Sequence, residues 1–153
     1  MAPHKVLGSD APSRARQVIR TNDVIVSTTR PNLNAVAMIP FELDNQICST
    51  GFCVLRSNGS IDPTYLFALV QSVEFVLCLS DLVKGALYPA VTEKQVRSQQ
   101  IPLPPLPEQR RIAAILDEQL SSVEKMRAAV EVQLEAAKAL PAALLRRAFN
   151  GEL

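Results

Sequence analysis

The sequence predicts an α+β fold: a small domain of short strands and a packed helix, followed by a long C-terminal helix of the coiled-coil type. Three observations carry this prediction. Short β-branched runs that end near prolines or glycines occupy the first part of the chain, and such runs are typical of strands. An apolar pattern with helical spacing follows Asp62-Pro63. The last third then holds a long segment without glycine or proline, in which apolar residues recur every seven positions.

The expected strands all lie before residue 60. Each is rich in β-branched or apolar residues and is bounded by turn-forming residues. The leading segment, 1–20, shows little periodicity and contains Pro3, Gly8 and Pro12, so we expect it to be irregular. The expected strands are 24–29, 35–39, 47–49 and 52–55.

Two helices are expected between the strands and the proline-rich segment. Asp62-Pro63 is a favourable start, because aspartate caps a helix and proline suits its first turn. Apolar residues from Tyr65 to Leu77 then predict a single helix that packs on the sheet and ends before Gly85. Thr92 and Gln95 have the spacing of a capping box, which predicts a further short helix.

A stiff strap and a long helix complete the chain. Four prolines fall within 101–107, and because proline fixes φ this segment should be extended. From Pro107 no glycine or proline occurs until Pro141, which allows roughly 34 residues or about 50 Å of helix. Pro141 is expected to kink or break the helix, leaving 142–149 as a short second segment.

The long helix carries an apolar edge, with glutamines at two of its positions. An edge of this kind is typical of a helix that packs along another helix. It is longer than a domain of roughly 100 residues should cover, so we favour a partner chain over a helix folded back on its own domain. The residues expected to line the partner interface are Ile112, Leu116, Val123, Met126, Val130, Leu134, Leu140 and Leu144.

Composition limits the kinds of site that the chain can hold. Sixteen Lys+Arg against fifteen Asp+Glu give a net charge of +1, so a nucleic-acid site would need locally clustered basic residues. Cys48, Cys53 and Cys78 lack metal-ligand spacing and are expected to be free thiols in a reducing cytoplasm. There is no glycine-rich phosphate loop, and the single histidine, His4, lies in the irregular leader. We therefore expect no enzymatic activity, no bound cofactor or metal and no membrane span.

The proline-rich run and the residues after it strongly resemble the junction in specificity subunits of type I restriction–modification systems. In that family a proline-rich strap and a Glu-Gln-Arg sequence lead from a target-recognition domain into a long conserved-region helix. The chain terminus, 144–153, also resembles the family, and 23–31, 62–66 and 85–89 do so more loosely. The run is Ile101-Pro102-Leu103-Pro104-Pro105-Leu106-Pro107-Glu108-Gln109-Arg110-Arg111-Ile112.

The resemblance implies a partial target-recognition domain over 1–106 and a helical dimerisation and partner-docking region over 107–153. It implies a non-catalytic subunit that binds double-stranded DNA and positions a modification (methyltransferase) subunit and a restriction subunit. Those partners would use S-adenosylmethionine and ATP. We also expect a homodimer through the C-terminal helices and a cytoplasmic location.

We expect the chain to depart from the family pattern: family recognition domains usually carry several more strands before the segment that matches Asp23, and full subunits have two such halves, whereas we expect only one half here, with its start missing. A half-length subunit, a fragment and a decayed gene product all remain open. The alternative function is a structural oligomerisation module with a coiled-coil arm and no DNA binding of its own.

Candidate DNA contacts lie in the loops beside the strands. Arg30 could bond a guanine edge or a phosphate. Asn32 and Asn34 could read adenine, although turn chemistry after a proline explains them equally well. Lys84 could meet a phosphate, although the dipole at a helix C-terminus also favours a lysine there. The full candidate set is Arg30, Asn32, Asn34, Thr29, Lys84 and Tyr88.

Overall fold

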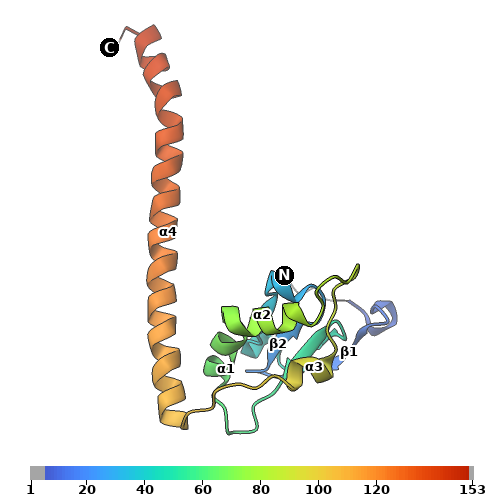
Figure 1. The fold of residues 1–153 in the computed structure, drawn as a ribbon. Helices are drawn as coiled ribbons and strands as arrows, with labels where there is room; N and C mark the ends of the chain where they lie inside the picture. The colour runs from blue at the N-terminus through green and yellow to red at the C-terminus, as the bar shows by residue number, and fades with distance from the viewer. Residues whose placement is uncertain (1–5, 152–153) are drawn as a thin grey trace. The chain divides into compact units, whose positions relative to one another are not determined.

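The computed structural model describes residues 6–151 and divides into two compact units, Met1–Ala113 and Ala114–Leu153. The first unit holds all the strands and short helices, and the second is the distal part of one long helix (Figure 1). The expected α+β class with a long C-terminal helix is confirmed. His4, and with it the start of the leader, lies outside the described residues.

Two small antiparallel sheets form the β part of the first unit. One pairs β1 (Ala15–Val18) with β4 (Ile47–Ser49), and the other has the order β3-β2-β5. In the second sheet β2 (Val24–Ser27) lies between β3 (Val36–Met38) and β5 (Phe52–Leu55). The strands expected from the β-branched runs are therefore confirmed, two of them with shorter bounds.

Strand β1 corrects the expectation that all of 1–20 is irregular. Its four residues contain an arginine and a glutamine, so their local preference for a strand is weak. The strand forms because it pairs with β4, Val18 opposite Ile47 and Gln17 opposite Cys48. The Gln17 side chain also donates to the carbonyl of Phe52 over 2.9 Å. Long-range pairing of this kind overrides local preference.

The single helix expected after Asp62 is two helices, so that prediction was wrong. Helix α1 (Pro63–Val70) and helix α2 (Val73–Asp81) meet at a bend of 57°. The break occurs because the Ser72 hydroxyl accepts the N–H of Phe75 over 3.2 Å and thereby caps a new helix. The expected end before Gly85 is confirmed.

A short helix, α3 (Glu93–Arg97), follows the capping box that the sequence predicts. The Thr92 hydroxyl accepts the N–H of Gln95 over 3.2 Å, and the Thr92 N–H donates to the Gln95 side chain over 2.8 Å.

Among the described residues no single helix has the length and apolar character needed to cross a membrane, and α1 with α2 reach that threshold only as a bent pair.

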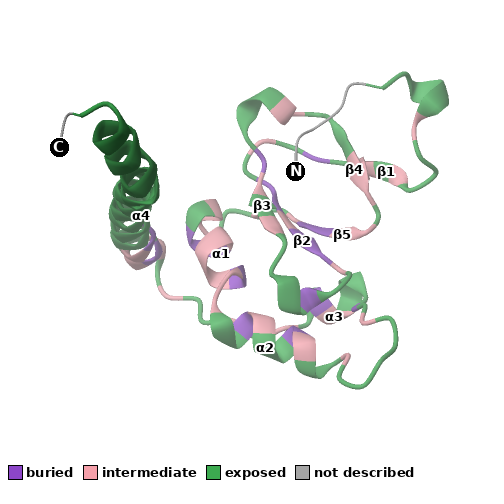
Figure 2. Cartoon of the chain, turned by 90° about the horizontal axis from the view of Figure 1, so that it is seen from above, coloured by how far each residue is buried: buried purple, intermediate pink, exposed green. Residues whose placement is uncertain are grey.

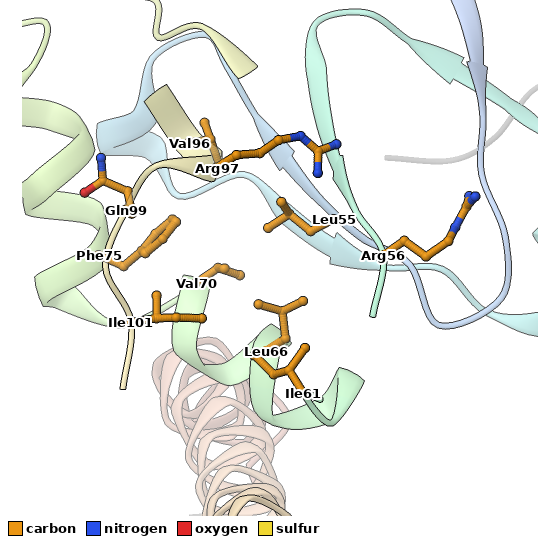
Figure 3. Close-up of a pocket in the computed structure, with 10 residues that line it drawn as sticks. All are labelled: Leu55, Arg56, Ile61, Leu66, Val70, Phe75, Val96, Arg97, Gln99 and Ile101. Carbon is orange, nitrogen blue, oxygen red and sulfur yellow. The ribbon is translucent and has the colours of Figure 1, made fainter. Parts of the chain in front are cut away.

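The main core lies between the three-stranded sheet and the three short helices, where the buried residues gather (Figure 2). A half-open pocket of about 150 Å³ adjoins it, and Figure 3 shows Val70, Phe75 and Ile101 gathered around this pocket. A smaller cluster joins Ile19 and Ile39 to β5. The main core consists of Val24, Val26, Cys53, Leu66, Val70, Phe75, Leu79, Val91 and Val96.

Helix α4 (Leu106–Phe149) is continuous over 44 residues, so of the kink or break expected at Pro141 the break, with a separate segment over 142–149, was wrong. A proline removes one helical hydrogen bond, here the one to the carbonyl of Ala137. The exposed position of Pro141 lets water reach that carbonyl. The surrounding alanines and leucines are also strong helix formers, which supports the turns on both sides.

Candidate nucleic-acid interface and helix junction

Two loops that are distant in sequence lie side by side at the end of β2. They are residues 28–34 and 84–91, which we call the paired loops. The backbone N–H of Arg30 donates to the carbonyl of Pro89 over 2.8 Å, and a further hydrogen bond and a one-residue β-bridge continue the pairing. The pairing brings residues 28–30 beside residues 89–91 and so joins the two loops that hold the candidate DNA contacts.

The tip of the first loop is a 3-10 turn, η2 (Pro31–Leu33), whose flanking residues adopt an uncommon backbone conformation. Arg30 has φ 50° and Asn34 has φ 47°, both in the left-handed region. Such positions cost about 1 kcal/mol or more for residues other than glycine and persist only where neighbouring bonds enforce them. Here the N–H of Leu33 donates to the Arg30 carbonyl over 2.9 Å. The turn is therefore rigid, as a loop that positions contact residues needs to be.

The side chains of the candidate residues fall into two groups. Arg30, Asn32, Lys84 and Tyr88 are exposed, and within residues 6–151 their side chains make no hydrogen bond or ion pair. Asn34 is exposed as well, but its amide donates to the carbonyl of Gln71 over 3.2 Å and fastens the turn to the end of α1.

Thr29 is engaged in the same local structure. Its hydroxyl lies 3.2 Å from that of Ser27, and its backbone bridges to Ala90. The geometry thus gives Asn34 and Thr29 structural contacts, whereas the other four candidate side chains have no polar partner within residues 6–151.

The charge of the paired loops has one sign. Arg30 is the only charged residue between Val24 and Phe41, and Lys84 is the only one between Leu82 and Thr92. Both charges within the paired loops are therefore positive, whereas α2, which contacts η2, carries the exposed acidic residues Glu74 and Asp81. Arg30 and Lys84 themselves have the charge that contact with phosphates requires.

The junction of strap and α4 depends on Gln109, a residue whose role the sequence did not reveal. Its side chain is 0% exposed and makes three hydrogen bonds. The amide nitrogen donates to the carbonyls of Pro104 (2.7 Å) and Ser60 (3.1 Å), and the amide oxygen accepts the N–H of Asp62 (2.8 Å). The signal was present in the Glu-Gln-Arg run, but spacing alone could not distinguish a buried glutamine from an exposed one.

An ion pair between the buried Asp23 and the exposed Arg56 fixes the start of β2. Asp23 is 1% exposed, and its carboxylate accepts two hydrogen bonds from Arg56, at 2.8 and 2.7 Å, and one from the N–H of Arg20 at 2.7 Å. The hydrogen bond to Asp23 raises the pKa of Arg56. Asp23 is therefore a structural residue, which holds the strand that leads into the paired loops.

The three cysteines are free thiols. Burial raises the pKa of Cys53 to about 11 and also raises the pKa of half-buried Cys48, whereas Cys78 is exposed. Within residues 6–151 no three potential metal ligands of the histidine, cysteine and carboxylate types come together.

The expected partner interface lies along α4. Ile112 belongs to the first unit and is half-buried there. The remaining residues lie in the second unit and are all exposed: Leu116, Val123, Met126, Val130, Leu134, Leu140 and Leu144.

Comparison with known sequence families finds one family whose pattern matches most of the chain. The type I restriction modification DNA specificity domain matches residues 11–135, which include both paired loops, the strap and most of α4. The chain belongs to this family. The match to a DNA specificity domain also covers the junction at Gln109, so the run from which the resemblance was first inferred lies inside the family's own pattern.

Relatives and solved structures agree with this family. The specificity subunit of the type I restriction enzyme EcoDI from Escherichia coli is 25% identical over 150 residues, which cover 98% of this chain and 33% of that protein. The crystal structure of the HsdS subunit from Thermoanaerobacter tengcongensis superposes with a TM-score of 0.78 at 44% identity, over 96% of this chain and 37% of that one.

A second solved structure, described as showing complex assembly and conformational transition of the type I R-M system, has a TM-score of 0.79 at 44% identity. It covers 99% of this chain and 38% of that one. The chain thus spans between a third and two fifths of the length of these three proteins.

Proposed function

We propose that this member of the specificity family is a DNA-recognition subunit of a type I restriction–modification complex. One observation carries the proposal: the exposed Arg30 stands on the rigid η2 turn, and the paired loops, which also hold the exposed Lys84, contain no acidic residue of their own. A preorganised turn with a cationic side chain favours DNA, because contacts to phosphates position a protein and side chains such as arginine read base edges.

The chemistry would belong to partner proteins. The Escherichia coli relative is named a specificity subunit of a restriction enzyme, and one similar structure is described by the assembly of the type I R-M system. We therefore assign to this chain a non-catalytic role in the cytoplasm, together with a modification (methyltransferase) subunit and a restriction subunit. In this assignment residues 1–106 recognise DNA and residues 107–153 dock partners.

A homodimer through α4 is the second part of the proposal. The exposed apolar edge from Leu116 to Leu144 suits a second helix of the same kind. Two copies would carry two sets of paired loops, and a dimer with two such sets can bind two half-sites on DNA.

The test compares sequence preference. The full chain, alone and with the modification subunit, is incubated with a random double-stranded DNA library, and bound sequences are recovered and measured for affinity. We expect enrichment of a defined motif. Arg30→Ala should weaken binding and relax one position of the motif, because a good bidentate contact contributes about 1–3 kcal/mol of base discrimination.

Two variants serve as controls in that experiment. Arg30→Lys keeps the charge but loses the bidentate geometry, so it should retain more affinity than sequence preference. Lys94→Ala removes an exposed charge from α3, outside the paired loops, and should bind as the unaltered chain does. If no sequence is enriched by the chain or by the complex, while the complex still assembles, the oligomerisation module is the correct function.

A further inference from the structure

Leu33 stands apart from the other large apolar residues around β2 and β3. From Val24 to Ile39 all the others are buried or half-buried in the two cores, whereas Leu33 is 64% exposed. It is the last residue of η2, the rigid turn at the tip of the first paired loop. An exposed leucine on a mobile loop would mean little, but this one is held in a fixed position.

The turn that presents Leu33 also presents Arg30. The N–H of Leu33 donates to the carbonyl of Arg30 over 2.9 Å, so the two residues belong to one hydrogen-bonded turn. The amide of Asn34 fastens the same turn to the end of α1. A surface that approaches DNA with Arg30 therefore brings Leu33 to the duplex as well.

We propose that Leu33 is a specificity-determining residue that contacts the C5-methyl group of a thymine in the major groove. The proposal rests on the DNA-recognition function argued above. Thymine is distinguished in the major groove by this methyl group, and apolar side chains are the groups that recognise it. Arg30, the one charged residue of residues 30–34, favours DNA over a protein partner as the occupant of this turn.

Replacement of thymine by uracil tests the contact, because uracil lacks only the methyl group. The duplex selected by the full chain with the modification subunit is prepared with each thymine replaced singly by uracil. We expect at least one replacement to weaken binding by about fourfold, which corresponds to the ~0.8 kcal/mol of one buried methylene-sized group.

Three variants of the protein test whether that loss of affinity comes from Leu33. Leu33→Ala should bind the thymine and uracil duplexes equally, and Leu33→Met should retain the preference for thymine. Leu103→Ala, which shortens an exposed leucine of the strap, should keep the full preference.

Three results would overturn the proposal while leaving DNA recognition intact: a selected motif without thymine, equal affinity of the unaltered chain for all uracil duplexes, or the same thymine preference in Leu33→Ala. Loss of modification-subunit binding in Leu33→Ala, without any thymine effect, would instead identify a protein contact. If selection enriches no sequence at all, the proposed function fails together with this inference.

Discussion

The backbone N–H of Asp62 donates to the side-chain oxygen of Gln109 over 2.8 Å, across a sequence separation of 47 residues. Asp62 is also the N-cap of α1, where its carboxylate accepts the N–H groups of Thr64 and Tyr65. One aspartate therefore connects the start of α1 to the first turn of α4, and the strap between them is held at a defined position. Further support comes from the Tyr65 hydroxyl, which donates to the carbonyl of Pro102 over 3.2 Å.

We predict that Gln109→Ala lowers the free energy of unfolding of the first unit by about 2–4 kcal/mol. The change leaves one N–H and two carbonyls without their buried partner, and each unsatisfied buried group costs about 1–3 kcal/mol, part of which water entry recovers. Urea unfolding followed by circular dichroism measures the loss.

Two further glutamine variants make that prediction specific. Gln109→Glu can still accept from Asp62 but, when ionised, cannot donate to Ser60 or Pro104, so it should also be destabilising. Gln133→Ala changes an exposed residue of α4 and should have little effect. Equal stability of all three variants would show that the bonds of Gln109 do not hold the junction.

The left-handed conformation of Arg30 leads to a prediction in which two variants differ in stability but not in DNA affinity. Arg30→Gly should unfold with a free energy about 1 kcal/mol higher than Arg30→Ala, since glycine adopts φ 50° without steric cost. Both variants lack the guanidinium and should bind DNA equally weakly. Thermal unfolding and fluorescence anisotropy provide the two readouts. Equal stability of the two variants would mean that the backbone of residue 30 is unstrained.

The exposed edge of α4 leads to a prediction about assembly. Val123→Asp with Val130→Asp should give a monomer that no longer binds a modification subunit, because buried carboxylates in a helical interface have no partner. Val132→Asp is the matched control: Val132 is 71% exposed and lies off the seven-residue repeat. Sedimentation velocity distinguishes these results, and a dimer that survives the double substitution would contradict the assigned interface.

Cys53 makes a contribution to stability that depends on pH. Its burial raises the pKa of the thiol from 9.0 to about 11. Below pH 9 the thiol is protonated in both states, whereas above it the unfolded chain releases a proton that folded Cys53 retains. Stability should therefore fall as pH rises from about 9 to about 11. Cys53→Ala should show a smaller fall over this window in urea unfolding, and an identical fall would place the effect elsewhere.

The sequence predicted those elements whose signal is local. The β-branched run at β2 and the capping box at α3 depend on residues within a few positions of each other, and both are confirmed. The break between α1 and α2 was missed, because Val70 and Val73 continue the apolar pattern across it and hide the cap at Ser72. Strand β1 was missed because its partner lies about thirty residues away in sequence.

The sequence likewise predicted only those features of the candidate site that depend on local residues. Residue type singled out Arg30 and Lys84, but no spacing rule indicated that their loops pair through Pro89. The use of Asn34 as a tie to Gln71, and of Gln109 as a buried clamp, also depends on contacts between distant segments. Such contacts appear only once the chain is folded.

The central claim is that the paired loops contact DNA, and the salt dependence of binding tests it most directly. The logarithm of the association constant is measured against the logarithm of salt concentration for the unaltered complex and for Arg30→Ala with Lys84→Ala. The account predicts a slope whose magnitude falls by roughly 0.9 for each phosphate contact that is removed, together with weaker binding. An unchanged slope and an unchanged affinity in the double variant would contradict it.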